Sequence, residues 1–246
     1  MRAAGWTEPT LRNRQGHVLA VMTCPRPAEQ DYLKITLATL KFAGLERWLG
    51  PRMIVADGYE PLVVGWPVYP SAERLGNSKT FLRALTLAVD TPGFTALTLL
   101  EDDVCLARNA LDYIAGIDVV ADPAVNRDLT HVAWCSFQPP RLPQKARIYD
   151  VILTNDFVGN QAVTMSAERV RALLASPAVR RWNARHNADL LFTVAFPDQP
   201  CGIHRPNLAQ HIGLASAVDD TRTIHPASLD FYIGDALDLL RKGAPV

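Results

Sequence analysis

Residues 94–104 read Phe94-Thr-Ala-Leu-Thr-Leu-Leu-Glu-Asp-Asp-Val104, and the rest of the chain is organised around this stretch. Six of its first seven residues are apolar or β-branched, with Ala96 the weak member, and Pro92-Gly93 comes directly before them. A short apolar run that opens after a turn predicts a strand buried on both faces, as in a parallel α/β sheet. The strand ends abruptly in three acids, Glu101, Asp102 and Asp103.

The three acids follow the carboxyl end of the predicted strand, which is where ligands gather in an open α/β sheet. Adjacent carboxylates repel one another, and a divalent cation is the simplest partner that makes such a cluster tolerable. Hard oxygen ligands favour Mg²⁺ or Mn²⁺, and these ions often share their coordination shell with substrate phosphates. The alternative is a solvated acidic turn that only ends the strand.

Apolar runs and helical periodicity alternate through the first half of the chain. The predicted elements are strands at 17–22 and 53–56, a short edge strand within 61–70, and helices at 29–42 and 78–89. Ser78 is a plausible N-cap for the second helix. Strand, helix and strand in this order predict parallel strands joined by a crossover helix, which is the plan of a nucleotide-binding half-domain.

The second half of the chain has a less regular pattern. The predicted elements are a helix at 109–117, strands at 130–137, 149–153 and 159–165, a helix from 167 with Ser166 as N-cap, and a helix at 229–242. We found no internal repeat and no low-complexity tract. At 246 residues the chain could form one α/β domain or two small ones.

Charge is uneven although the chain has 25 basic and 25 acidic residues. Residues 127–185 hold nine Lys or Arg and four acids, a net charge of +5, so the remainder carries −5. This asymmetry indicates an anionic partner on one lobe or a solvated basic face. The four cysteines show no C-x-x-C spacing, and the first apolar run is too short to span a bilayer, so we expect a cytoplasmic protein with free thiols.

Three further motifs follow the acids in order. They are Phe157-Val-Gly-Asn-Gln-Ala-Val-Thr-Met-Ser166, Ala188-Asp-Leu-Leu191 and Arg205-Pro-Asn-Leu-Ala-Gln-His-Ile-Gly213. With them, residues 17–216 resemble the GT-A class of nucleotide-sugar-dependent glycosyltransferases, and in particular the animal N-acetylglucosaminyltransferases IV and related enzymes with an EDD motif of the DxD type. The arginine-rich segment before Asp189 departs from that group.

The resemblance implies a GT-A (Rossmann-like) fold, with a mixed, mostly parallel sheet flanked by helices in one domain over residues 1–246. Residues 17–103 would form the nucleotide-sugar-binding half, and residues 104–246 the acceptor and catalytic half. It further implies that Asp103 is the direct metal ligand, that Asp102 faces the ribose or a metal-bound water, and that Glu101 faces the nucleotide.

Two residues of the second half take roles from the resemblance. Asp189 matches the general base that removes the proton of the acceptor hydroxyl in an inverting reaction. The alternative role for Asp189 is to stabilise the N-terminus of a helix. His211 would bind the metal or contact the β-phosphate, and its alternative is a structural hydrogen bond.

Candidate donor-binding residues come from loop positions at strand ends. Asp57 follows a predicted strand and suits a hydrogen bond to base or ribose, although Asp57-Gly58 is also a simple turn. Four residues carry donors suited to a pyrophosphate, and each could equally lie in an ordinary surface loop. They are Thr23, Arg26, Asn77 and Lys79.

The predicted function is transfer of a hexosyl or N-acetylhexosaminyl group from a nucleoside-diphosphate sugar, with a UDP-sugar first among the donors, to a glycan or small molecule. Arg180, Arg181 and Arg185 are predicted to bind an anionic acceptor, or else to pair with acids such as Asp198. Three alternatives remain. They are transfer to a hydroxylated base in DNA, a non-catalytic sugar-binding module, and a sugar-phosphate nucleotidyltransferase, which the loop 23–27 disfavours because it has no glycine.

Overall fold

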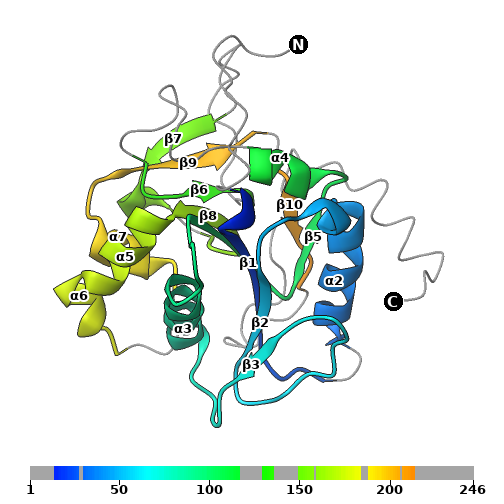
Figure 1. Cartoon of the computed structure of the whole chain (residues 1–246). Helices are drawn as coiled ribbons and strands as arrows, with labels where there is room; N and C mark the ends of the chain where they lie inside the picture. The colour runs from blue at the N-terminus through cyan, green and yellow to red at the C-terminus, as the bar shows by residue number, and fades with distance from the viewer. Residues whose placement is uncertain are drawn as a thin grey trace, which may run out of the picture.

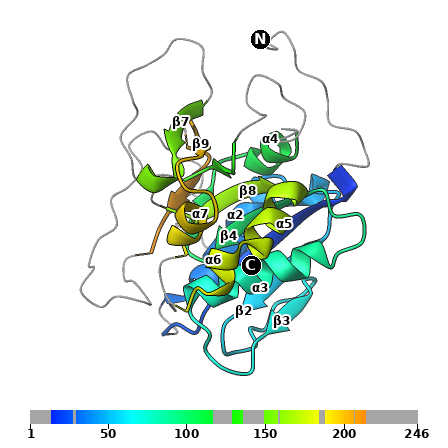
Figure 2. The same ribbon diagram turned by 90° about the vertical axis from the view of Figure 1, so that its left-hand side faces the viewer.

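The computed structural model describes residues 14–27, 30–116, 129–135, 149–157, 159–183, 188–205 and 207–213. Within these ranges the chain forms one large sheet with helices on both faces, as Figures 1 and 2 show from two directions. The predicted helix at 229–242 lies outside the described residues. None of the helices in these ranges is both long and apolar enough to span a bilayer.

The sheet has eight strands in the order β3-β2-β1-β4-β8-β6-β9-β7. Their bounds are β1 (His17–Thr23), β2 (Arg52–Ala56), β3 (Val68–Pro70), β4 (Ala96–Glu101), β6 (Val132–Ala133), β7 (Tyr149–Leu153), β8 (Ala162–Ser166) and β9 (Pro200–His204). Strands β3, β2, β1 and β4 run parallel to one another, and β6 runs parallel to β9. The other three neighbouring pairs are antiparallel. The prediction of a mixed, mostly parallel sheet flanked by helices is therefore confirmed.

Two cores cover the two faces of the sheet. One face packs against α3 (Asn77–Val89), α5 (Ala167–Ala175), α6 (Pro177–Arg180) and α7 (Leu190–Ala195). The other packs against α2 (Tyr32–Phe42), α4 (Ala110–Gly116) and the two-stranded ribbon of β5 (Val104–Leu106) and β10 (Ala209–His211). Figure 1 shows these two groups on opposite sides of β1. Short 3-10 turns, η2 (Leu45–Arg47) and η3 (Thr154–Asp156), join the larger elements.

Strand β1 shows why the sheet forms where it does. All seven of its residues are buried, with Val18, Ala20 and Met22 in one core and Leu19 and Val21 in the other. A strand that is apolar on both faces can bury both only between two layers of helices, and each fully buried aliphatic side chain contributes about 1.5–3 kcal/mol.

Two local predictions were wrong. Helix α3 begins at Asn77 with Gly76 as its N-cap, so Ser78 lies inside the first turn and is fully buried. Of the strand expected at 130–137, residues 130–135 are described, and among them only β6 is strand; the Trp134 carbonyl that follows accepts from the backbone N–H groups of Leu208 and Ala209, each at 2.9 Å. By contrast, Ser166 caps α5 as predicted, accepting from Arg169 N.

The topology brings three strand ends to one edge of the sheet. Because β1, β2 and β4 are parallel neighbours, their carboxyl ends, Thr23, Asp57 and Glu101, follow one another along this edge. The backbone N–H of Asp57 donates to the carbonyl of Thr23 at 2.9 Å, which continues the β1–β2 ladder into the loops. Side chains that are far apart in the sequence are therefore neighbours here.

Candidate active site at the carboxyl edge of the sheet

The acid turn is the segment Asp102–Asp103 that joins β4 to β5. Both side chains are buried, with residue exposures of 3% and 4%. Thr36 of α2 fixes the backbone of the turn, because its hydroxyl lies 2.6 Å from the Asp102 carbonyl and 2.8 Å from the Val104 carbonyl. The turn is thus held by the helix beneath it, and this leaves the carboxylates free for other partners.

Two side chains, one from the end of β1 and one from the loop after it, bind the carboxylate of Asp102. The Thr23 hydroxyl donates to Asp102 Oδ2 at 2.7 Å. The Arg26 Nη2 atom donates to Asp102 Oδ1 at 2.8 Å and to Asp103 Oδ2 at 2.9 Å. The structure therefore brings Thr23 and Arg26 together with the acids, as a shared role in donor binding requires.

His211 reaches the acid turn through the pairing of β5 with β10. The register places His211 opposite Val104, and the Ile212 N–H donates to the Asp103 carbonyl at 2.8 Å. His211 Nε2 consequently lies 3.2 Å from Asp103 Oδ2. A β-carbon on Gly213 would come within 2.6 Å of the same Oδ2 atom, so this position accepts only glycine without displacing the carboxylate.

Glu101 is held by two amides. Asn77 Nδ2 donates to Glu101 Oε1 at 2.9 Å. When the Asn160 amide is oriented so that its nitrogen faces the neighbouring carboxylates, that nitrogen lies 3.1 Å from the same Oε1 atom. Burial, followed by the charge of Asp103, raises the pKa of Glu101 to about 8. In the absence of a cation, Glu101 is therefore largely protonated at neutral pH.

Asp189 joins this network from the start of α7. In the same orientation the Asn160 amide nitrogen lies 2.8 Å from Asp189 Oδ1, and the Gly159 N–H donates to Asp189 Oδ2 at 3.2 Å. Asp189 occupies the N-cap position of α7 but makes no capping hydrogen bond to that helix. Its carboxylate is thus turned toward Glu101 and remains partly exposed.

Glu101, Asp103 and His211 have the residue types and spacing of a metal site. One ligand atom from each lies within 4.8 Å of the others, close to the span of about 4–5 Å between ligands on opposite sides of one cation. Asp103 Oδ1 is buried and accepts no hydrogen bond from any described residue. An orphaned carboxylate oxygen is costly unless a donor or a cation meets it, so the site fits a hard divalent ion.

The titration of the cluster agrees with this fit. Burial would raise the pKa of Asp103, but the hydrogen bond and charge of His211 and the charge of Arg26 hold it below its usual range. Burial opposes a charge on His211, yet the bond to Asp103 raises its pKa overall. An ionised carboxylate is ready to bind a cation, whereas binding by His211 would release a proton.

The remaining predicted residues lie apart from the acid turn. Asp57 accepts the N–H groups of Leu75 and Gly76 at 2.5 and 3.1 Å, so it organises the turn before α3, a role that was not among those predicted for it. Lys79 is exposed on the first turn of α3. Within the described ranges neither residue contacts the acids.

The arginine-rich segment is only partly described. Arg180 and Arg181 are exposed on and after α6, and Arg180 Nε donates to the Leu174 carbonyl at 3.3 Å. Arg185 lies outside the described residues. Among the described residues no ion pair joins these arginines to Asp198, whose carboxylate instead accepts from Asn155 Nδ2 at 2.5 Å.

Sequence reasoning assigned no role to three residues that shape the site. Asn160 and Gly213 lie inside motifs that carried the resemblance, yet only the folded chain shows what they contact. Thr36 looked like an ordinary helix residue. One local sequence signal pointed to Asn160. It directly follows Gly159, whose φ of 113° is favoured by glycine, and a Gly-Asn pair of this kind is typical of a constrained polar loop.

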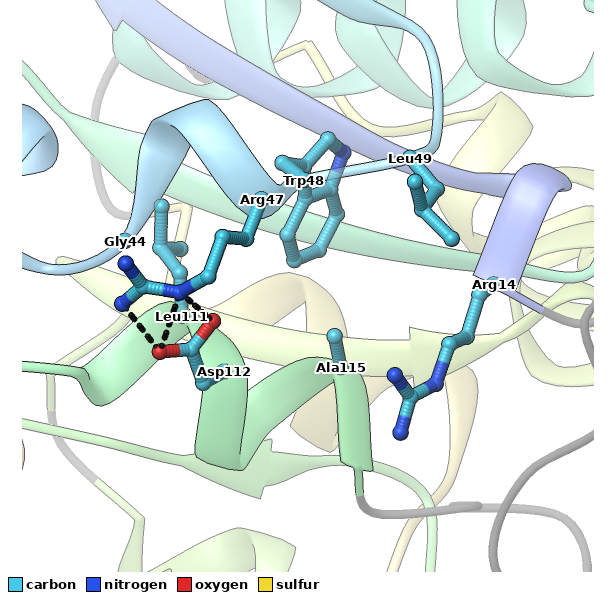
Figure 3. Close-up of a pocket in the computed structure, with 8 residues that line it drawn as sticks. All are labelled: Arg14, Gly44, Arg47, Trp48, Leu49, Leu111, Asp112 and Ala115. Carbon is cyan, nitrogen blue, oxygen red and sulfur yellow. Dashed lines mark hydrogen bonds and ion pairs between the residues drawn. The ribbon is translucent and has the colours of Figure 1, made fainter.

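A separate pocket of about 200 Å³ lies at the other end of β1 (Figure 3). Arg14 borders it just before β1, and Trp48, Leu111 and Ala115 form its apolar wall. Arg47 on its rim is neutralised by an ion pair with Asp112. The length of β1, roughly 20 Å, separates it from the acid turn. The pocket therefore takes no part in the candidate active site.

No protein-family model and no curated protein matches the chain. Among solved structures it is similar to a Drosophila β-1,4-galactosyltransferase 7 crystallised with manganese, UDP-Gal and xylobiose, at 9% identity and a TM-score of 0.44, over 79% of that chain and 90% of this one. It is similar to the glycosyltransferase GlyE of Streptococcus pneumoniae at 9% identity and 0.45, where it spans 91% of its own length but only 63% of GlyE. A 4-diphosphocytidyl-2C-methyl-D-erythritol synthase from Anaerococcus prevotii is similar at 10% identity and 0.43, over 79% of this chain and 91% of that one.

Proposed function

We propose that the protein is a metal-dependent glycosyltransferase of the GT-A class that uses a nucleoside-diphosphate sugar. One observation carries the proposal: Asn160 joins a candidate metal ligand, Glu101, to a candidate base, Asp189, in a single hydrogen-bonded network. Donor-side and acceptor-side groups of such an enzyme must lie this close, because the sugar carbon passes between them. The EDD motif and the order of the later motifs support the same class.

The donor half of the site is built from the ends of β1 and β4. Glu101, Asp103 and His211 would hold Mn²⁺ or Mg²⁺, which when bound stabilises the negative charge that develops on the departing diphosphate. The Asp102 carboxylate accepts hydrogen bonds from Thr23 and Arg26. In this position Asp102 would contact the ribose, and Arg26 would contact the pyrophosphate.

The acceptor half depends on Asp189. Its two carboxylate oxygens accept from the Gly159 N–H and the Asn160 amide. Asp189 is partly exposed at the start of α7, so an acceptor hydroxyl can approach it from solvent. In an inverting reaction Asp189 takes the hydroxyl proton while the acceptor oxygen bonds to the anomeric carbon. The bond from that carbon to the diphosphate oxygen breaks, and the diphosphate leaves with the electron pair. We propose a glycan or small molecule as the acceptor.

A screen of nucleotide sugars with and without Mn²⁺ tests this function. We expect one donor to raise the melting temperature only when Mn²⁺ is present, and to be hydrolysed slowly with release of the nucleoside diphosphate. Release of pyrophosphate from a nucleoside triphosphate would instead identify a nucleotidyltransferase. Donor binding with no turnover toward any acceptor would indicate a binding module.

Two aspartate variants divide the mechanism. Asp103→Asn should abolish Mn²⁺-dependent donor binding, since it removes the proposed metal ligand. Asp189→Asn should keep donor binding but lower transfer by about 10²–10⁴-fold, the usual effect of removing a general base. Asp90→Asn, at an exposed helix end, is the matched control and should change neither. Loss of donor binding in Asp189→Asn, with normal turnover of bound donor, would contradict the base role.

A further inference from the structure

The guanidinium of Arg26 lies between the carboxylates of Asp102 and Asp103. A single nitrogen, Nη2, is 2.8 Å from Asp102 Oδ1 and 2.9 Å from Asp103 Oδ2, so one positive group bridges both acids. The three side chains are nearly removed from solvent, with exposed fractions of 11%, 4% and 6%. The ring of Tyr32 lies against the guanidinium, with Arg26 Cζ 4.9 Å from its centroid. Arg26 therefore occupies a place between two carboxylates that suits a cation.

This bridge is in conflict with a divalent ion at the same acids. Asp103 Oδ2 already faces Arg26 at 2.9 Å and His211 at 3.2 Å. An ion bound through this oxygen must displace one of those two groups. An ion bound through Asp103 Oδ1 still comes within a few ångströms of the guanidinium, and positive charges at such a distance in a buried site repel strongly.

We propose that Arg26 is a built-in counter-ion that holds the acid turn in the metal-free protein and gives up Asp103 when a divalent cation binds. The inference rests on the proposed function, because it takes the divalent site as given. Once released from Asp103, Arg26 is available to the oxygens of the diphosphate, with which it forms charge-assisted hydrogen bonds. Cation and diphosphate then bind cooperatively, because each lowers the cost of separating Arg26 from Asp103.

The exchange has a consequence that a static ion pair lacks. If Arg26 only braces the turn, removing it loosens the acids and weakens or leaves unchanged their hold on a cation. If Arg26 competes with the cation, removing it strengthens cation binding and reduces the factor by which the nucleotide raises cation affinity. The sign of the change in cation affinity therefore separates the two roles.

Calorimetric titration of the wild-type and variant proteins with Mn²⁺, first alone and then with UDP present, measures the direction in which the cation affinity changes. We expect Arg26→Gln to bind Mn²⁺ about tenfold more tightly than the wild-type protein without nucleotide, within the usual range of couplings between sites. UDP supplies phosphate ligands to Mn²⁺ in both proteins, so it should raise the Mn²⁺ affinity of both, but by a larger factor in the wild type than in Arg26→Gln. Arg26→Lys keeps the positive charge but loses the second contact of the guanidinium, from Nε to Asp102 Oδ2 at 3.4 Å, so its Mn²⁺ affinity should fall between the two.

Arg52→Gln is the matched control, because Arg52 also lies over an aromatic ring, with Cζ 5.5 Å from the Trp66 centroid, but away from the acids. Its Mn²⁺ affinity should equal that of the wild type. Wild-type protein that binds Mn²⁺ with no gain in Arg26→Gln would overturn this inference and leave the proposed function standing. Wild-type protein that binds no Mn²⁺ even with UDP would overturn both. If Arg26→Gln does not fold, the direction in which Arg26→Lys changes the Mn²⁺ affinity decides between the two roles.

Discussion

The electrostatic cost of the acid cluster can be measured with Glu101→Gln in the metal-free protein. Glu101 Oε1 accepts from Asn77 Nδ2 at 2.9 Å and from the Asn160 amide at 3.1 Å. A glutamine oxygen can accept both hydrogen bonds in the same position. The substitution therefore removes the titratable proton and the charge while it preserves the shape and the contacts of the side chain.

The magnitude follows from the pKa of Glu101, which burial and the charge of Asp103 raise from 4.5 to about 8. Between these values the folded protein binds a proton that the unfolded chain has lost. The free energy of unfolding therefore falls as the pH rises through this window, and is level above it. At about 1.36 kcal/mol per unit the ceiling is on the order of 5 kcal/mol. Because Glu101 is partly exposed, solvent screening reduces this, and we expect about 2 kcal/mol.

Urea unfolding in the presence of EDTA, from about pH 5 to 9, tests this expectation. Wild-type protein should lose stability across that range, Glu101→Gln should lose less, and the gap should close when Mn²⁺ is added to the wild type. Glu60→Gln removes the charge of an exposed glutamate and should follow the wild type. Wild-type and Glu101→Gln curves that stay parallel at all pH values would refute the reasoning.

Three other perturbations probe the site and its surroundings. Gly213→Ala places a β-carbon 2.6 Å from Asp103 Oδ2 and should weaken Mn²⁺ binding, by titration, about tenfold. His131 is fully buried with its pKa lowered to about 3 by burial, so stability is lost as the pH falls below 6.5; His131→Phe should flatten that acid limb in thermal unfolding. If Arg180 and Arg181 bind an anionic acceptor, replacing both with Gln should remove the salt dependence of acceptor KM, and an unchanged KM across a salt series would place them outside the acceptor site.

The longer strands were predictable because each carries its own signal. Strands β1, β2 and β4 are apolar runs buried on both faces, and the turn and helix signals around them fix their order along the chain. The sequence could not reveal β5, β9 and β10, which have three to five residues and no strong alternation. Short strands are stabilised by partners that are distant in sequence, as when His211 pairs with Val104.

The acids of the site were predictable for a local reason. Thr23, Arg26 and Asn77 were candidates from their loop positions, and Asp189 and His211 from the resemblance, whereas Thr36, Asn160 and Gly213 were not predicted. Glu101, Asp102 and Asp103 are adjacent and end a strand, so their convergence needs no tertiary information. The position of Ser78 shows the opposite case. Its identity suggested an N-cap, but Asp57 accepts the N–H groups of Leu75 and Gly76 from across the sheet edge, and the helix begins earlier.

A structural origin of the acid cluster is hard to reconcile with its energetics. Stability alone would not retain a glutamate whose proton is held to about pH 8, nor a buried Asp103 oxygen that no described residue satisfies. Gly213 adds a third cost, because a flexible residue is kept where any side chain would strike Asp103. Each feature has an ordinary explanation by itself. At one strand end, beside the partly exposed carboxylate of Asp189, the three features together support the cation site that we propose.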